Sequence, residues 1–169
     1  MHTMQTKHST FESKKAKILA KPVSEFVPHS PPMVLLDKIL DFEQNTLTAQ
    51  FEVTEHSRFY CPELKGIESW VGIEYMAQAV AALAGVRAYL VEQPVKLGFL
   101  LGTRKFDIHQ ALFAANQTYQ VVITELFMDD SGLGAFDCSI LHNETPVCQA
   151  KLNVFESNDT DQLLNKENP

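Results

Sequence analysis

The chain has 169 residues, of which 45% are hydrophobic, and its formal net charge at pH 7 is -7. This length and apolar content suit one ordinary domain with a single core better than two small domains. The acidic balance and the lack of a basic run exclude nucleic acid and an anionic membrane as main partners, because both require a concentrated basic face.

The two ends of the sequence are polar and have no sustained apolar periodicity. Residues 1–25, which are rich in lysine, and residues 157–169 are therefore predicted to be flexible tails. A single domain is predicted between them, over residues 26–156. No apolar signal-peptide core is found at the N-terminus, so the three cysteines are not expected to form a disulfide framework, and the expected location is the cytoplasm.

The first part of the domain shows the alternation that is typical of a half-buried strand. In residues 46–53 ("TLTAQFEV") every second side chain is apolar. Residues 33–42 precede this strand across the turn residues "EQN", which favours an antiparallel pair. Similar segments separated by turns predict a meander over residues 117–128, 135–142 and 147–155. Cys138 and Cys148 share the apolar faces of its last two strands and are predicted to be small buried hydrophobic residues.

One long helix is predicted from about Glu68 to Leu90, between these groups of strands. It is apolar around most of its circumference and must therefore be surrounded by protein. A membrane span is rejected because polar residues are spread along the helix and strands flank it on both sides. The remaining architecture is α+β, an antiparallel sheet wrapped around one central helix, which is the hotdog fold. Trp70 is expected to anchor the helix by packing, and close approach to the sheet is expected at Ala77, Ala81, Ala84 and Ala88.

The carboxylate of Glu74 is unusual in such an apolar helix. An unpaired buried carboxylate costs roughly several kcal/mol, so Glu74 is expected to have a partner and to serve in proton transfer. The alternative is that Glu74 only accepts hydrogen bonds at a dimer interface. Gln78 lies one helical turn later on the same face, where its amide can donate to the carboxylate and orient it. The alternative for Gln78 is a polar group at that interface without a chemical task.

Several separated motifs resemble a known family. The helix "GIEYMAQA" is similar to the "IEAMAQ" helix of FabZ-type 3-hydroxyacyl-[acyl-carrier-protein] dehydratases, and "VPHSPPMVLLDKIL" is similar to their N-terminal "LPHRYPFLLVDRV". The stretches "WVGIEYMAQAVAALAG", "GFLLGTRKF" and "AKLNVF" resemble more closely the ApeP-like group, predicted hotdog dehydratases of aryl-polyene biosynthetic clusters. This resemblance covers most of residues 27–156. It implies a role for Glu74 in eliminating water from a 3-hydroxyacyl thioester.

The sequence departs from that family at the second catalytic group. In FabZ-type enzymes this group is the histidine of a "GHFP" motif, contributed across a dimer interface shortly before the helix. Here the corresponding stretch is "FYCPELKG", in which Tyr60 occupies the position of the histidine and only Pro62 is retained. The glycine usually found where the helix begins, whose amide can polarise the thioester carbonyl, is replaced by Ser69.

Four interpretations of this departure lead to different functions. Another residue of the chain can replace the histidine: Tyr60, His56, or His29, which in the wider family organises the start of a strand. In the favoured interpretation, a related hotdog subunit that retains the histidine pairs with this chain, and Glu74 completes a composite dehydratase site. The third is a non-catalytic scaffold or acyl-binding subunit, and the fourth is an acyl-thioesterase in which Glu74 activates water.

An acyl chain needs a slot between the helix and the sheet, and the stretch "KLGFLLGTRKF" has the form to supply it. Its glycines are expected to allow close backbone approach, and its apolar residues to form a wall. The alternative is a buried strand kinked by glycines. Its two basic residues, with Arg87 and Lys96, are candidates for contacts to phosphopantetheine or an acidic carrier protein, or else ordinary surface charges. The predicted substrate-binding residues are Gly98, Phe99, Leu100, Gly102, Arg104 and Lys105.

The resemblance also implies partners. The substrate would be carried on the 4′-phosphopantetheine of an acyl carrier protein or on CoA, and the chain would form a homodimer or a heterodimer with a second hotdog dehydratase subunit. No metal is expected, because the six histidines are scattered without ligand spacing. No phosphate-binding glycine loop or nucleophile elbow is found, and no diffusible cofactor is expected.

Overall fold

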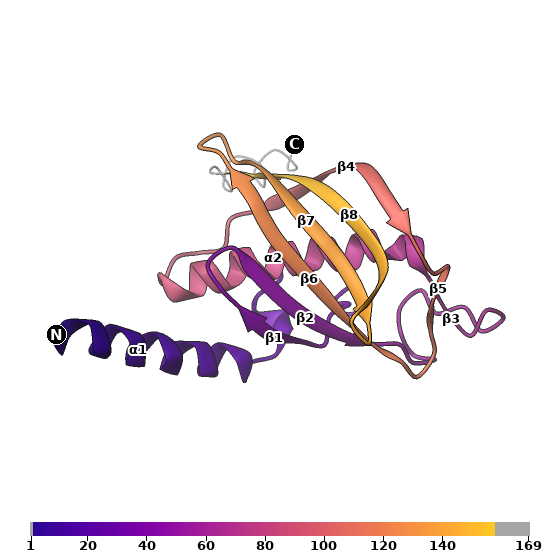
Figure 1. Ribbon diagram of the computed structural model, residues 1–169, viewed down its shortest axis with the longest axis horizontal. Coiled ribbons are helices and arrows are strands. Elements are labelled where there is room, and N and C mark those ends of the chain that lie inside the picture. The colour runs from indigo at the N-terminus through magenta and orange to yellow at the C-terminus, as the bar shows by residue number, and fades with distance from the viewer. Residues whose placement is uncertain (1, 158–169) are drawn as a thin grey trace, which may run out of the picture.

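The computed structural model describes residues 2–157, with side chains from residue 11 onward. Most of residues 157–169, predicted to form a tail, lies outside this range. Six antiparallel strands form one sheet in the order β1-β2-β6-β7-β8-β4, and the long helix α2 (Gly72–Leu90) lies across one face of it (Figure 1). The strands of this sheet are β1 (Lys38–Phe42), β2 (Thr46–Glu52), β4 (Gly98–Ile108), β6 (Thr118–Met128), β7 (Leu133–His142) and β8 (Thr145–Glu156).

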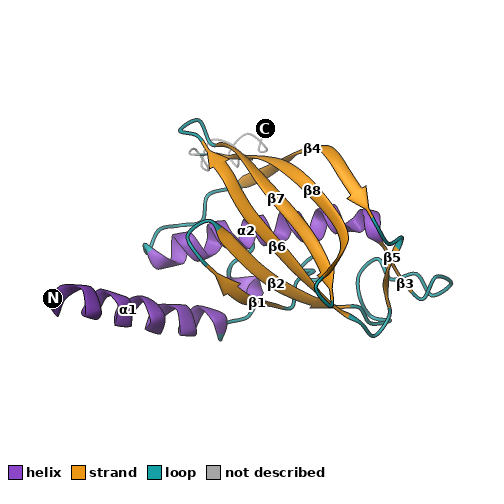
Figure 2. Cartoon of the chain, viewed as in Figure 1, coloured by secondary structure: helices purple, strands orange, loops and turns teal. Residues whose placement is uncertain are grey.

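This arrangement confirms the predicted hotdog fold, and Figure 2 shows the sheet curving around α2. Two further short strands, β3 (Gly66–Glu68) and β5 (Leu112–Ala114), pair with each other next to the N-terminal end of α2, and a single 3-10 turn (Ser69–Val71) leads from β3 into the helix. The helix therefore begins close to the predicted position and ends at the predicted residue.

The alternation in β2 agrees with the burial of its side chains. Leu47, Ala49 and Phe51 are completely buried, whereas Thr46, Thr48 and Gln50 between them are half-buried. The strand β1 starts only at Lys38, although the pattern predicts a strand from residue 33. Residues 33–35 run instead along the helix, because backbone groups in this stretch hydrogen-bond to the side chain of a helix residue.

Close packing around the helix depends on two glycines and not on the predicted alanines. A Cβ atom at Gly85 would lie 2.0 Å from the carbonyl oxygen of Phe26, and one at Gly72 would lie 2.9 Å from the sulfur of Cys148 on β8. The prediction is wrong for three of the four alanines, because Ala77, Ala81 and Ala84 are on the side of α2 that faces a groove, which Ala88 does not line. Their small side chains leave space rather than bring the sheet nearer.

Within the segment predicted to be a tail, the structure has a helix, α1 (His2–Leu19), whose N-terminal part extends beyond the sheet (Figure 1). Ile18 is completely buried, and the ring of Phe11 meets that of Phe42 edge to face at 6.3 Å. The ammonium of Lys15 lies 2.7 Å from the carboxylate of Asp41 on β1. Few apolar residues make these contacts, which is why no helical periodicity stands out in the sequence.

Two other predictions about side chains have clear outcomes. Cys138 and Cys148 are buried as predicted, and burial raises the pKa of each thiol to about 12. Trp70 is not the predicted packing anchor, since 59% of it is exposed at the turn before α2. None of the helices within residues 2–157 is long and apolar enough to cross a membrane.

Candidate active site

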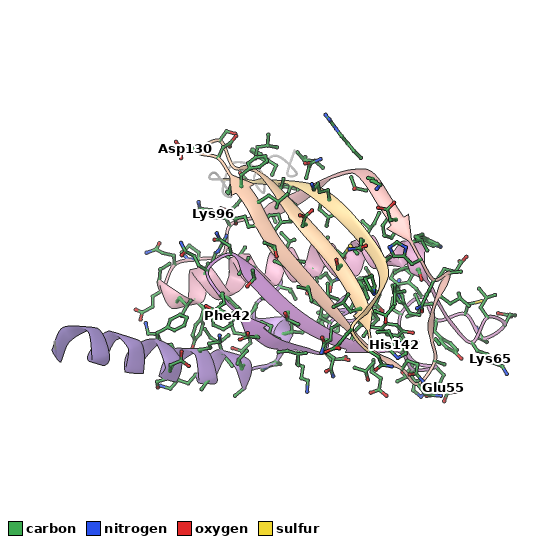
Figure 3. The ribbon with its side chains drawn as sticks, viewed as in Figure 1. Phe42, Glu55, Lys65, Lys96, Asp130 and His142 are labelled. Carbon is green, nitrogen blue, oxygen red and sulfur yellow. The ribbon has the colours of Figure 1, made fainter. Side chains whose placement is uncertain are left out.

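A mostly apolar groove of about 160 Å³ runs along α2. Its floor is the row of small residues Ala77, Ala81 and Ala84 on the helix. One wall is the start of β4, and the other is formed by the last residues of β6 and β8 and by Phe136 in the first half of β7. Glu74 lies at the end nearest the start of α2, and Arg87 lies toward the helix C-terminus. Lys96, which also lines the groove, is labelled in Figure 3.

The carboxylate of Glu74 is held at the mouth of this groove. Its side chain is 36% exposed, so it is less enclosed than an acid surrounded by hydrocarbon would be. The side-chain amide of Gln78 donates a hydrogen bond of 3.0 Å to Oε1 of Glu74. The Nε2 atom of His29 lies 3.4 Å from the same oxygen. Because both groups approach Oε1, Oε2 is the carboxylate oxygen available to a bound substrate.

Gln78 is completely buried, and its amide orientation is fixed by the backbone of the segment before β1. Its Oε1 atom accepts a hydrogen bond of 2.8 Å from the N–H of Leu35, and its Nε2 atom donates one of 2.6 Å to the carbonyl of Met33. Because the carbonyl end of the amide faces Leu35, the amino end must face Met33 and Glu74. The predicted hydrogen bond from Gln78 to Glu74 is therefore present, and the same side chain fastens residues 33–35 to the helix.

His29 is brought to Glu74 by the same segment, from a position that lines the groove. Its Nδ1 atom is buried and has no hydrogen-bond partner among the described residues. Its Nε2 atom faces the carboxylate, so an N–H at that position can donate to Glu74. The geometry therefore places His29 to orient Glu74.

The other candidates for the missing histidine do not line the groove of Glu74 within the same chain. Tyr60 and His56 line a separate, more polar hollow together with Asp37 and Tyr75. Neither residue contributes to the groove of Glu74. In FabZ-type enzymes the corresponding loop acts across a dimer interface. A role for Tyr60 at the site of a second subunit therefore stays a prediction.

The amide that would occupy the place of the family's glycine is already engaged. The N–H of Ser69 donates a hydrogen bond of 2.9 Å to the carbonyl of Ala111. Its hydroxyl is buried and has no partner among the described residues. A thioester carbonyl would have to compete with Ala111 for this N–H, so the usual polarising contact is not prepared at this position.

The predicted substrate-binding residues divide into two groups. Gly98, Phe99 and Leu100 line the groove, while Gly102, Arg104 and Lys105 do not. A Cβ atom at either glycine would meet no atom of the described chain within 4 Å, so no other part of the protein lies close to them. The physical reason is that β4 is an edge strand with open space beside it. Gly102 is required for another reason, its φ of 132° at an irregularity of the strand.

The basic side chains considered for carrier recognition also lie in different places. Arg87 hydrogen-bonds Glu125 and the carbonyl of Gln44, and Lys96 forms an ion pair of 3.2 Å with Glu156, both beside the groove. Arg104 and Lys105 are exposed on β4, where Lys105 lies 3.0 Å from Asp107. This second pair lies on an edge strand, where a protein partner can reach it.

No group of three or more His, Cys, Asp or Glu side chains within the described part of the chain has the arrangement of a metal site. The sequence does not identify the alanine row of α2 or the wall residues on β6, β7 and β8 as groove residues. The only available signal is the repetition of alanine at helical spacing on the face of Glu74.

The curved sheet, the central helix and the carboxylate at an apolar groove together define a hotdog protein with a candidate acid–base site. The family described as ApeP dehydratase matches residues 21–165. The chain therefore belongs to the ApeP-like family of dehydratases, as its motifs predict.

Curated relatives agree with this assignment. The 3-hydroxyacyl-[acyl-carrier-protein] dehydratase FabZ of Acinetobacter baylyi is 21% identical over 121 residues, which cover 69% of this chain and 80% of that protein. FabZ of Francisella philomiragia is 34% identical over 85 residues, covering 47% of this chain and 52% of that protein. FabZ of Chlamydia trachomatis is 30% identical over 93 residues, covering 52% and 60%. The last two matches span less than two thirds of the relatives' length.

Solved structures give the same fold. A chain of the dehydratase heterocomplex ApeI:P from Xenorhabdus doucetiae superposes with a TM-score of 0.78 at 26% identity, covering 88% of this chain and 99% of that one. The PaaI protein of Escherichia coli, from a phenylacetic acid degradation operon, has a TM-score of 0.54 at 11% identity and covers 69% of this chain and 80% of its own. This second likeness concerns the fold alone.

Proposed function

We propose that the chain is the glutamate-donating subunit of a 3-hydroxyacyl carrier-protein dehydratase. The observation that carries this proposal is Glu74, held by Gln78 at the mouth of an apolar groove in a chain of the ApeP-like family. Dehydration requires removal of a proton from C2 and departure of the C3 hydroxyl as water after it receives a proton. A carboxylate with one free oxygen beside the groove is suited to exchange one of these protons with the substrate.

The second group is supplied by a partner subunit in this proposal. The family's histidine is replaced by Tyr60, and His29 is fixed with Nε2 toward Glu74 and a buried Nδ1. In this proposal His29 orients the carboxylate of Glu74, and the second proton-transfer group comes from the other subunit. One solved relative is itself a dehydratase heterocomplex, which supports pairing with a second hotdog subunit.

The substrate proposed is an acyl thioester carried on the 4′-phosphopantetheine of an acyl carrier protein or on CoA. The apolar groove floored by Ala77, Ala81 and Ala84 would receive the acyl chain, with C2 and C3 beside Glu74. Such a reaction requires no diffusible cofactor, because water is eliminated without oxidation or reduction. We place the protein in the cytoplasm, which agrees with its three free cysteines.

The experiment compares three preparations on a 3-hydroxyacyl carrier-protein substrate. These are the purified chain, the complex recovered with it from its native cells, and the same complex with Glu74→Gln. The proposal expects dehydration only by the native complex, with a loss of about 10²–10⁴-fold in the variant, the usual contribution of an acid–base group. Glu68→Gln is the matched control, since Glu68 is exposed just before the helix and should leave the rate unchanged.

Other outcomes would assign a different function. Full activity of the Glu74→Gln complex would mean that the chain is a scaffold or acyl-binding subunit. Release of free thiol would indicate thioester hydrolysis, because dehydration leaves the thioester intact. Robust turnover by the isolated chain, abolished in Glu74→Gln, would show that no partner histidine is needed.

A further inference from the structure

Arg87 is tied to the sheet by every nitrogen of its guanidinium. Nη1 contacts the carboxylate of Glu125 on β6, Nε and Nη2 donate to the carbonyl of Gln44, and Nη2 also donates to the side chain of Asn45. The side chain of Glu125 is only 13% exposed. This cluster, which we call the Arg87 clamp, joins the last turn of α2 to the β1–β2 turn and to β6, and holds the arginine in one position.

The Arg87 clamp separates two hollows. On one side it lines the groove that contains Glu74. On the other side it lines an apolar hollow between α1, the end of β1 and the end of α2. Phe42, on that second side, lies beside α1 in Figure 3. The hollow is formed by Arg87 with Phe11, Phe42, Glu43, Gln44, Val86, Leu90 and Val91.

The position of Arg87 along α2 sets the length of the groove floor between this residue and Glu74. Glu74 and Arg87 both line the groove, and the helix rises about 1.5 Å per residue, so they are roughly 20 Å apart along its axis. Between them the floor is alanine at successive turns. A straight acyl chain that starts beside Glu74 meets no large side chain of α2 before the clamp, apart from the edge of Val80.

We infer that Arg87 is the end stop of the acyl groove and sets the longest acyl chain that the protein accepts. The inference rests on the proposed function, in which an acyl thioester binds with its reacting carbons at Glu74. Because the nitrogens of Arg87 already donate to protein oxygens, the clamp acts as a wall and not as an anchor for a polar chain end. A chain that is too long would have to displace a guanidinium from these partners, which is costly.

The test measures binding of saturated S-acyl pantetheine analogues of increasing length to the full chain by titration calorimetry. Each methylene that enters an apolar site tightens Kd by about fourfold. In the wild type, Kd should fall by this factor with each added methylene, a series that we call the affinity ladder, until the chain is long enough to reach Arg87. Longer chains should bind no more tightly. In Arg87→Ala/Glu125→Gln the ladder should continue by at least two methylenes, a gain of about tenfold or more for the longer chains, because the two hollows become one.

Two controls make the result specific. Arg87→Met/Glu125→Gln has the same charge change and retains a long side chain, so its ladder should stop at the wild-type length. Ala81→Leu fills the middle of the groove, so its ladder should stop earlier than that of the wild type. Glutamine replaces Glu125 in both double variants because a mostly buried carboxylate without its arginine would destabilise the fold.

The outcomes separate the two proposals. A ladder that stops at the same length in the wild type and in Arg87→Ala/Glu125→Gln, while Ala81→Leu shortens it, would overturn the end stop and leave the proposed function standing. No length dependence in any variant, including Ala81→Leu, would mean that acyl chains do not use the groove. That result would remove the basis of the proposed function as well.

Discussion

At the scale of single residues, the candidate site depends on Gln78 and His29, whose side chains both approach Oε1 of Glu74. Gln78 presents its amide to Glu74 because Leu35 occupies the other end of the same group. His29 approaches the same carboxylate from the loop that Gln78 fastens. The polar groups thus orient one another, and each can be assigned a role only by a change that affects one contact at a time.

His29 is predicted to orient Glu74 without itself exchanging protons with the substrate. His29→Gln keeps a side-chain N–H donor, so it should lower kcat of the complex by less than about tenfold, against 10²–10⁴-fold for removal of an acid–base group. The shape of the pH–rate profile should be that of the wild type. Measurement of kcat from about pH 5 to 9 checks this, and the disappearance of one limb of the profile in His29→Gln would make His29 the catalytic partner.

Gln78 is predicted to be a positioning residue that also stabilises the fold. Gln78→Leu leaves the N–H of Leu35 and the carbonyl of Met33 without their partner, which should lower the free energy of unfolding by about 2–4 kcal/mol. Because Glu74 then lacks the hydrogen bond from Gln78, kcat should fall while KM changes little. Denaturant titration measures the loss of stability, and steady-state kinetics measures the change in kcat and KM. Gln93→Leu is the control, since that exposed glutamine should change stability by less than about 0.5 kcal/mol. A normal kcat in a stable Gln78→Leu protein would contradict the positioning role.

At the scale of elements, the helix α2 is predictable because periodicity and motif agree over its whole length. The sequence identifies Glu74 and Gln78 as a pair, and the structure has the hydrogen bond between them. The row of Ala77, Ala81 and Ala84 suggests a packing surface, yet a small side chain can serve either to bring elements together or to leave room for a ligand. Only the position of β4 and of the wall residues on β6, β7 and β8 decides between these uses.

Other elements could not be predicted because their contacts are distant in sequence. Helix α1 is stabilised by Phe11 and Ile18 against the body of the protein and by Lys15 against Asp41, none of which gives a local signal. The stretch before β1 has a strand-like pattern, yet its backbone partners are on Gln78. In both cases a tertiary contact outweighs the local preference.

Gly85 is predicted to be essential for the packing of α2 against the segment that precedes β1. Gly85→Ala places a Cβ atom 2.0 Å from the carbonyl oxygen of Phe26, so the backbone must shift, and we expect the free energy of unfolding to fall by about 3 kcal/mol. Gly98→Ala is a matched control, because no atom lies within 4 Å of the added methyl group and the change should be within about 1 kcal/mol of zero. Equal stabilities of the two variants by chemical denaturation would refute the close approach.

At the scale of the whole molecule, the net charge of -7 creates a problem for recognition of an acidic carrier protein. Like charges repel at long range, so binding needs a local region of opposite sign. Arg104 and Lys105 are adjacent and exposed on the edge strand β4, where they form a local basic region even though Lys105 also pairs with Asp107. Phe99 and Leu100 on the same strand line the groove, so a carrier bound at this pair would have a short path for its pantetheine arm.

Reversal of this pair should therefore affect carrier-protein substrates selectively. In Arg104→Glu/Lys105→Glu we expect KM for a 3-hydroxyacyl carrier protein to rise by about 2–30-fold or more, because two exposed ion pairs with the carrier, each worth roughly 0.2–1 kcal/mol, are lost. KM for the same acyl group on pantetheine, which has no acidic protein surface, should change less than about twofold.

Lys17→Glu/Lys38→Glu has the same change in net charge at exposed positions elsewhere, so it controls for long-range repulsion. The difference between the two substrates should shrink as ionic strength increases, because exposed charges are screened. Equal rises of KM for both substrates, or an equal effect of Lys17→Glu/Lys38→Glu, would show that Arg104 and Lys105 do not contact the carrier.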